Sequence, residues 1–163
     1  MPVKSILSRA DKQIIQEAVQ QELYASHLYK QMANFMQRAG YFGARAFFAG
    51  EASDELEHYE KHVQFMNDMG DVAEVPALPA ITERPEGLEA AVQLGFDTEM
   101  ALGKKYERWY RAATSEVTRQ HLLQFLEIQR KSIGEYGDWL ARIERAAGDE
   151  CGLLIIDKEM GAN

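Results

Sequence analysis

Glu55 and His58 form a Glu-x-x-His pair within a stretch that has the pattern of an amphipathic helix. Residues three apart on a helix lie one turn apart on the same face, so both side chains can contact one metal ion. Such a pair alone is a weak indicator, because glutamate and histidine usually lie on a solvated face. The pair becomes informative if further ligands reach the same level of the fold.

Glu22 is expected at that level. It lies 18 residues before Gly40, whereas Glu55 and His58 lie 15 and 18 residues after it. An antiparallel helical hairpin that turns at Gly40 therefore brings the three side chains together across the interface of its two helices.

Glu99 and Gln129 are placed in the same way about a second turn, since Glu99 lies 15 residues before Thr114 and Gln129 lies 15 residues after it. Three buried carboxylates in one layer repel each other, and each costs on the order of several kcal/mol to desolvate without a partner. Two hard or borderline cations remove that cost, with glutamates as bridging ligands and imidazole completing the coordination. The sequence therefore predicts a two-metal site between helices.

Four long helices are expected to position these residues, with ends marked by serine caps and glycines. The expected helices span residues 8–38, 41–69, 86–113 and 116–147. The segment 71–85 contains Pro76, Pro79 and Pro85, so it is not helical throughout, and it is long enough to return along a bundle. Residues 151–163 are expected to add one or two helical turns. The prediction is an all-α four-helix bundle, a single domain over 1–163, with a long crossover between its second and third helices.

Each expected helix carries a stripe of residues at alternating steps of three and four, the seam of a bundle core. The stripes are apolar at their ends and polar in their middles, which is the anomaly that the metal site explains. The second-helix stripe is Phe48, Glu51, Glu55, His58, His62, Phe65 and Met69, and the fourth-helix stripe is Leu122, Leu126, Gln129, Ile133, Tyr136, Leu140 and Ile143.

Other polar residues on or beside the stripes have simpler interpretations. Tyr29 and Tyr136 are typical of core aromatics whose hydroxyl is hydrogen-bonded. His62 is expected to be a hydrogen-bonded core histidine, with a spare metal ligand as the alternative. Glu51 and Asp54 are expected on a solvated face, with a relay of cations toward the site as the alternative.

Composition limits the class of protein. The chain has 163 residues and a net charge of -8, which argues against nucleic acid as a partner. No stretch approaches the roughly 20 apolar residues of a membrane span, and the start lacks the apolar run of a signal peptide. Cys151 is the single cysteine, which indicates a reducing compartment and oxygen or nitrogen ligands. A cytoplasmic location is expected.

Several motifs resemble those of one family. Residues 22–29 (Glu-Leu-Tyr-Ala-Ser-His-Leu-Tyr) are similar to the first-helix motif of non-haem ferritins, which has a ligand glutamate and a tyrosine seven residues on. Residues 54–58 resemble their second-helix Glu-x-x-His, and Glu99 falls where their third helix supplies a carboxylate. Residues 152–160 resemble the C-terminal segment of bacterial ferritins. The likeness to bacterial non-haem ferritins spans almost the whole chain and implies the ferritin-like four-helix bundle.

The resemblance implies iron storage with ferroxidase chemistry at two iron ions per subunit. Glu22, Glu55 and His58 would hold the first iron, with Glu55 as the bridge, while Glu99 would hold the second iron with Gln129 nearby.

Tyr29 would hydrogen-bond a ligand or donate an electron. Dioxygen or hydrogen peroxide would be reduced by both irons, and the ferric product would mineralise inside a homo-oligomeric shell, which ferritins form from 24 subunits.

Two positions depart from relatives within the family. Many relatives place a second Glu-x-x-His, or a Gln followed three residues later by Glu, on the fourth helix, whereas this chain has Gln129 and then Ser132. The second iron site is therefore expected to be weak, labile or completed by water. Bacterioferritins carry a haem-ligating Met where this chain has Leu56, so haem is not expected.

Two alternatives stay open at this point. A di-iron or mixed-metal oxidoreductase acting on peroxide or an organic substrate would need an open pocket beside the metals, and the apolar stripes indicate a filled core. A metal-free binding or structural bundle would need the glutamates to point outward.

Overall fold

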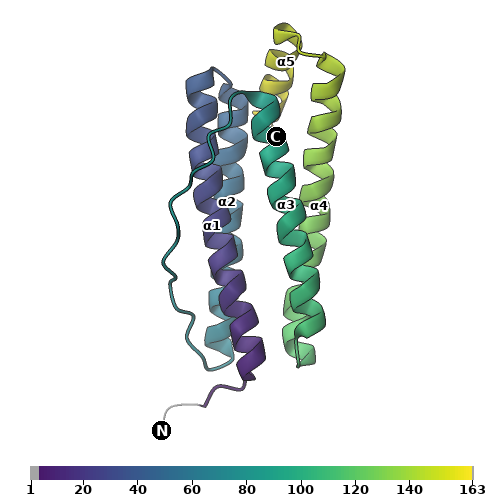
Figure 1. Cartoon of the computed structure of the whole chain (residues 1–163). Helices are drawn as coiled ribbons and strands as arrows, with labels where there is room; N and C mark the ends of the chain where they lie inside the picture. The colour runs from purple at the N-terminus through teal and green to yellow at the C-terminus, as the bar shows by residue number, and fades with distance from the viewer. Residues whose placement is uncertain (1–3, 163) are drawn as a thin grey trace.

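The computed structural model describes residues 4–162 as helices joined by turns and one long extended segment (Figure 1). The helices are α1 (Arg9–Ala39), α2 (Phe42–Asp68), α3 (Leu88–Ala112), α4 (Glu116–Ala146) and α5 (Glu150–Met160). The first four form two hairpins, α1 with α2 and α3 with α4, which lie side by side. The predicted four-helix bundle is confirmed, with helix boundaries that agree to within two residues.

The helix ends have the serine caps and the glycine that the sequence indicated. The side chains of Ser8 and Ser115 accept hydrogen bonds from backbone amides in the first turns of α1 and α4. Gly40 ends α1 in the left-handed conformation, with φ of 86°, which a residue without a Cβ adopts at little cost. These caps set where each helix begins or ends, and hence the heights at which its polar residues lie.

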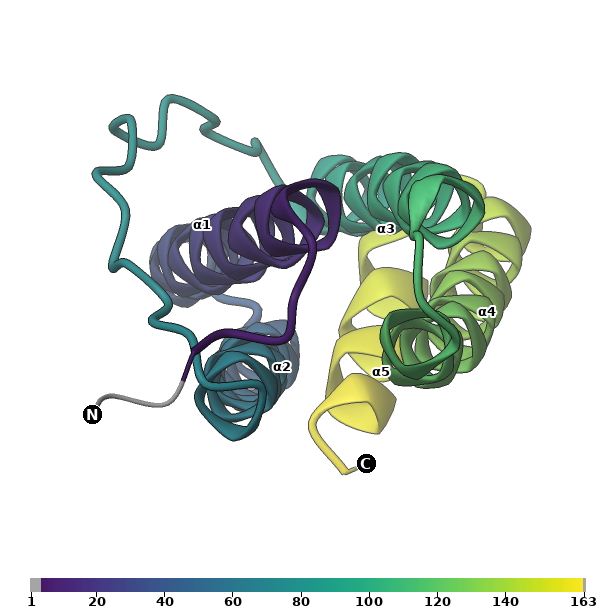
Figure 2. The same cartoon turned by 90° about the horizontal axis from the view of Figure 1, so that it is seen from below.

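The crossover between α2 and α3 runs along the outside of α1 (Figures 1 and 2). Two glutamines of α1 hold it through backbone groups: Gln16 Nε2 donates to Glu74 O at 2.7 Å, and Gln31 Nε2 donates to Glu83 O at 2.7 Å. The crossover therefore returns the chain along the bundle, as predicted, so that α3 can lie beside α1.

The helix in the C-terminal tail is longer than expected. It has 11 residues (α5), whereas one or two turns were predicted. Its Asp157 carboxylate accepts hydrogen bonds from the backbone amides of Gly43 (3.2 Å) and Ala44 (2.7 Å) at the start of α2. Acidic groups are favourable at a helix N-terminus because its amides lack partners within the helix. Docking onto α2 and α4 thus stabilises α5, and this explains why the local sequence pattern alone underestimates the length of the helix.

Two separate apolar clusters fill the bundle, one toward each end. Between them lies the polar layer, which consists of Glu22, Glu55, His58, Glu99 and Gln129. This confirms the apolar ends and polar middles of the stripes. The predicted stripes differ in detail on α4, where Phe125 and Trp139 are buried and Leu126 and Leu140 are only partly so.

The stripe on α2 differs in the same way, because Ala44, Ala52 and Met66 are buried and Phe65 is not. Small residues let α1 approach closely, so that Ser26 Oγ donates to Ala52 O at 2.7 Å. A strict alternation of three and four drifts around a straight helix of 3.6 residues per turn, which explains both differences.

Within residues 4–162, no helix has the length and apolar character needed to cross a membrane.

Candidate metal centre

Glu22, Glu55 and His58 lie together inside the α1–α2 hairpin, at the level predicted from their distances to Gly40. His58 Nδ1 is 3.1 Å from Glu55 Oε2 and 3.6 Å from Glu22 Oε2, and one ligand atom of each residue lies within 4.8 Å of the others. The side chains are 0% (Glu22), 3% (Glu55) and 12% (His58) exposed. This group of two carboxylates and one imidazole can hold a metal ion.

The group is short of positive charge. Glu22 Oε2 is buried and has no hydrogen-bond partner among the described residues. Burial and the neighbouring Glu22 raise the pKa of Glu55 well above its usual range. Burial also acts to raise the pKa of Glu22, but the proximity of the Glu55 carboxyl and of His58 lowers it to about 2. A metal ion bound here would supply the positive charge that the two buried carboxyls lack.

Asp11 is a buried carboxylate elsewhere in the bundle, and protein donors hydrogen-bond both of its oxygens. Asp11, at 0% exposure, accepts hydrogen bonds from the backbone amides of Thr114 (2.7 Å) and Ser115 (3.2 Å) and from Thr118 Oγ1 (2.9 Å). These bonds tie α1 to the α3–α4 turn and leave no need for a cation. The unpaired oxygen of Glu22 is therefore a property of the polar layer and not of buried acids in general.

Glu99 and Gln129 meet across the α3–α4 hairpin, as their spacing from Thr114 predicted. Gln129 Nε2 donates to Glu99 Oε2 at 2.7 Å, and Tyr29 Oη donates to Glu99 Oε1. Burial raises the pKa of Glu99, while the hydrogen bonds from Tyr29 and Gln129 lower it and the charge of Glu22 raises it again. Gln129 Oε1 is buried without a partner in residues 4–162. Glu99 and Gln129 thus form a second, neighbouring set of donor atoms.

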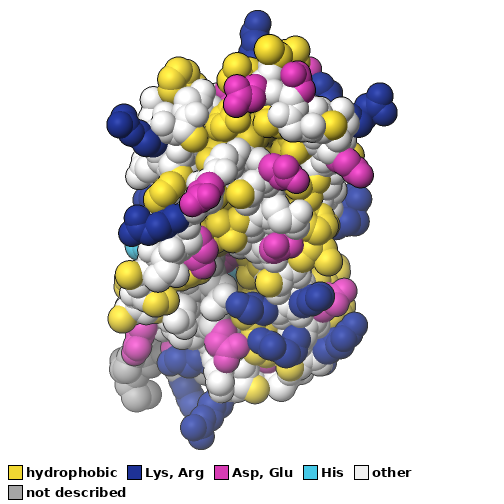
Figure 3. All heavy atoms as spheres, turned by 45° about the horizontal axis from the view of Figure 1, so that its top comes forward, with side chains coloured by type: hydrophobic (Ala, Val, Ile, Leu, Met, Phe, Trp, Pro, Cys, Tyr) yellow, Lys and Arg dark blue, Asp and Glu magenta, His cyan; other side chains and the backbone are white. Residues whose placement is uncertain are grey.

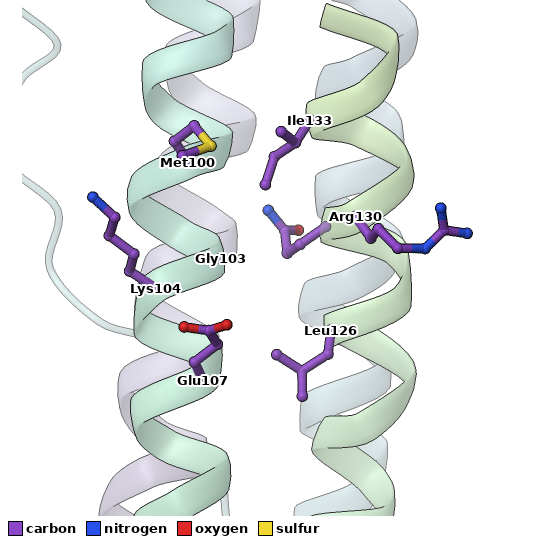
Figure 4. Close-up of a pocket in the computed structure, with 8 residues that line it drawn as sticks. Met100, Gly103, Lys104, Glu107, Leu126, Arg130 and Ile133 are labelled. Carbon is purple, nitrogen blue, oxygen red and sulfur yellow. The ribbon is translucent and has the colours of Figure 1, made fainter. Parts of the chain in front are cut away.

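A cavity of 370 Å³ opens between α3 and α4 beside Gln129 (Figure 4). Met100, Leu126 and Ile133 form its apolar walls, and Gly103 leaves room because it has no side chain. The charged groups of Lys104 and Arg130 point away from the gap between the two helices. The apolar stripes indicated a filled core, and that expectation is wrong beside Gln129. Leu126 and Ile133 are only partly buried there and line the cavity.

Glu51 departs from the expected solvated face. It is half-buried, and Tyr136 Oη donates to its Oε2 at 3.0 Å. Burial and the charge of Glu99 raise the pKa of Glu51 to about 8, although the Tyr136 hydrogen bond lowers it. The hydroxyl of Tyr136 is therefore satisfied, as expected of a core aromatic.

His62, His121 and Tyr106 form hydrogen bonds beside the polar layer that the spacing of residues in the sequence did not predict. His62 is a hydrogen-bonded core histidine, as expected, but its partners are Tyr106 and His121. Tyr106, whose ring is buried, donates its hydroxyl to Glu22 Oε1. Its position seven residues after Glu99 places it on the same face, and that spacing was the available signal.

The donor set suits iron. Carboxylates with imidazole match the ligands that borderline divalent ions prefer, and the described ligand groups include no thiolate. Glu22 Oε2 and Gln129 Oε1 lie in the two halves of the layer, and each is a buried acceptor atom without a protein partner in the described chain.

Comparisons with known proteins agree with this fold. A family model described as "Ferritin-like domain" matches residues 12–146. The "Soma ferritin" of Lymnaea stagnalis is 31% identical over 89% of this chain and 87% of that protein. A "Probable bacterial non-heme ferritin-like protein" of Haemophilus influenzae is 23% identical over 96% of both chains. The open pore ferritin from Archaeoglobus fulgidus superimposes with a TM-score of 0.91 at 20% identity, over 96% of this chain and 98% of that one.

Proposed function

Because the chain belongs to the ferritin-like domain family, we propose that it is an iron-storage protein with ferroxidase activity. Fe(II) is the substrate in this proposal. Two ions bind between the helices and give up one electron each, and the oxidant takes up both electrons with two protons. Dioxygen becomes hydrogen peroxide, or hydrogen peroxide becomes two molecules of water. The ferric product then hydrolyses and is stored as mineral.

The buried group of Glu22, Glu55 and His58 is the observation that carries the proposal. We assign the first Fe(II) to these three side chains, and we assign Glu55 as the bridge to the second. Holding two reductants at fixed positions lets both electrons reach one oxidant molecule, which is the contribution that positioning makes to the rate.

We assign the second Fe(II) to Glu99, with Gln129 nearby. Both carboxylate oxygens of Glu99 already accept hydrogen bonds, from Tyr29 and Gln129, so the ion has to displace at least one of them. Gln129 adds no charge. The second ion is therefore expected to bind more weakly than the first, which suits a site that must pass its product on.

Tyr29 is the fifth residue that we assign to the catalytic site. Its hydroxyl is fully buried and donates to Glu99, and burial raises its pKa well above the ordinary value. It therefore stays protonated and donates a hydrogen bond to Glu99, and electron donation is the alternative role that we propose for it.

Storage requires an assembly, and we propose a cytoplasmic homo-oligomeric shell of the kind that ferritins form from 24 subunits. Three exposed apolar side chains at the start of α2 and on α5 support this proposal, because other copies would cover them: Phe42 (62% exposed), Leu154 (53%) and Ile155 (59%). Hydrophobic side chains also gather over the upper part of the face drawn in Figure 3.

Iron loading tests the proposal. Purified protein is given Fe(II) in air in rising amounts, and the iron that stays with the protein is measured after gel filtration. We expect uptake far beyond two ions per subunit in wild type. We also expect rapid oxidation to be abolished by Glu55→Ala, which removes the bridge, and not by Glu57→Ala on the exposed face of α2. Unchanged initial rates in Glu55→Ala would contradict the assignment.

The cavity beside Gln129 favours a second candidate, a di-iron or mixed-metal oxidoreductase that acts on peroxide or an organic substrate without bulk storage. Its substrate would reach the metals from between α3 and α4. Retention of about two metal ions per subunit, with no mineral at any loading, would favour this candidate over storage.

A further inference from the structure

A continuous line of hydrogen bonds connects the buried carboxylate of Glu22 to the surface. Tyr106 Oη bonds to Glu22 Oε1, and His62 Nε2 lies 2.8 Å from Tyr106 Oη. His62 Nδ1 lies 2.9 Å from His121 Nε2, and His121 Nδ1 lies 3.3 Å from the side-chain amide nitrogen of Gln124. The line starts at a fully buried residue of α1, passes through α3 and α2, and ends at an exposed residue of α4.

The hydrogen-bonding capacity of each group fixes the direction of the line. The ionised carboxylate of Glu22 can only accept, so Tyr106 donates to it. The hydroxyl oxygen of Tyr106 then accepts from His62 Nε2–H, which leaves His62 Nδ1 to accept from His121 Nε2–H. His121 Nδ1 in turn accepts from the amide of Gln124. Every donor points toward Glu22.

Both imidazoles are in the neutral form that this arrangement requires. Burial lowers the pKa of His62 to about 3, against the opposing charge of Glu22, and burial with the charge of Lys61 lowers the pKa of His121 to about 4.

Packing holds the rings in place. The Tyr106 ring stacks on Phe125 with centroids 5.2 Å apart, and the His62 ring stacks on the same phenylalanine at 4.2 Å. The His121 ring stacks on Phe65 at 4.1 Å. Since these rings come from α2, α3 and α4, the hydroxyl of Tyr106 is fixed by the bundle itself and not by a single flexible side chain.

This line acts on the two oxygens of Glu22 unequally. Oε1 is held by Tyr106, whereas Oε2 is buried without a partner in the described chain and lies 3.6 Å from His58 Nδ1. Glu99 differs, because both of its oxygens accept hydrogen bonds. Glu22 is thus preset to offer one defined oxygen to an ion.

We infer that Tyr106 and His62 are positioning residues for the first iron site, which hold Glu22 Oε1 and so aim Glu22 Oε2 at the ion shared with Glu55 and His58. The inference rests on the proposed function, because it assumes that an ion binds there. Hydrogen bonds of this kind to metal ligands typically change metal affinity by about 10–100-fold.

Anaerobic titration with Co(II) alone, followed by its visible absorption, tests the inference without any oxidation step. Tyr106→Phe keeps the ring and its stacking but removes the hydroxyl, and we expect Co(II) affinity at the tighter site to fall by about 10–100-fold with an altered spectrum. Tyr24→Phe is the matched control, since the hydroxyl of Tyr24 makes no hydrogen bond within the described residues, and it should bind as wild type does. The thermal unfolding midpoint is measured for each variant.

A second pair of variants separates the hydrogen bond from packing. In His62→Gln, the side-chain amide can still donate to Tyr106 and accept from His121, so near-normal Co(II) affinity is expected. In His62→Leu, the volume is kept but Tyr106 loses its donor, so affinity should fall.

The outcomes are distinguishable. Wild-type protein that fails to bind Co(II) would overturn the proposed metal site and this inference together. Wild-type binding with equal affinity in Tyr106→Phe would overturn only the positioning role, as would an equal loss in His62→Gln and His62→Leu.

Discussion

The side-chain amide of Gln129 on α4 donates a hydrogen bond to Glu99 Oε2 on α3 at 2.7 Å. The ligand group between these two helices therefore contains one charged and one uncharged residue. We expect Gln129→Ala to lower the initial rate of Fe(II) oxidation by roughly tenfold, because the hydrogen bond orients a ligand but adds no charge. The comparison is with Glu55→Ala under the same stopped-flow conditions. An effect as large as that of Glu55→Ala would mean that the second site matters as much as the first.

Glu51 gives a prediction for the pH dependence of stability in metal-free protein. Burial raises its folded-state pKa to about 8 from an ordinary 4.5. Between these values the folded chain keeps a proton that the unfolded chain has lost, so stability falls as pH rises from about 4.5 to about 8. Glu51→Gln removes this loss.

The measurement is the unfolding midpoint of chelator-treated protein across pH. Glu51→Gln should exceed wild type at pH 8, and the difference should shrink toward pH 4.5. Glu57→Gln, on the exposed face of the same helix, should follow wild type throughout. A constant offset between Glu51→Gln and wild type at every pH would contradict the assigned protonation.

Gly43 gives a prediction for the docking of α5. A Cβ at this position would lie 1.7 Å from the backbone oxygen of Asp157. Gly43→Ala therefore has to push α5 away from α2, and we expect a loss of about 1–3 kcal/mol in stability with faster proteolysis of the C-terminal segment. Gly50→Ala in the same helix is the control, because its added Cβ would meet no described atom within 4 Å apart from its chain neighbours and the nearby backbone of its own helix, and it should be neutral or slightly stabilising. Equal behaviour of the two variants would rule out tight docking.

The heights of the polar residues could be predicted from the sequence because helical rise is regular. Once Gly40 and Thr114 are recognised as turns, the distances to Glu22, Glu55 and Glu99 follow from counting residues. The fold class followed from the same counting together with the proline-rich crossover.

Other features depend on ring orientation and tertiary docking, which counting does not give. Tyr106 has a buried ring, and only the structure shows that its hydroxyl reaches Glu22. Phe125 lies one position from the predicted Leu126, within the drift of a strict heptad on a straight helix. The length of α5 depends on Asp157 contacting α2, which no local pattern contains.

The most direct test of the central claim is diffraction from crystals soaked anaerobically in Fe(II), with anomalous data collected at the iron absorption edge. We predict two iron peaks per subunit within the polar layer, one among Glu22, Glu55 and His58 and a weaker one beside Glu99, with Glu55 between them. Iron peaks only at the surface, or glutamates that face bulk solvent, would contradict the account and leave the helical fold as its surviving part.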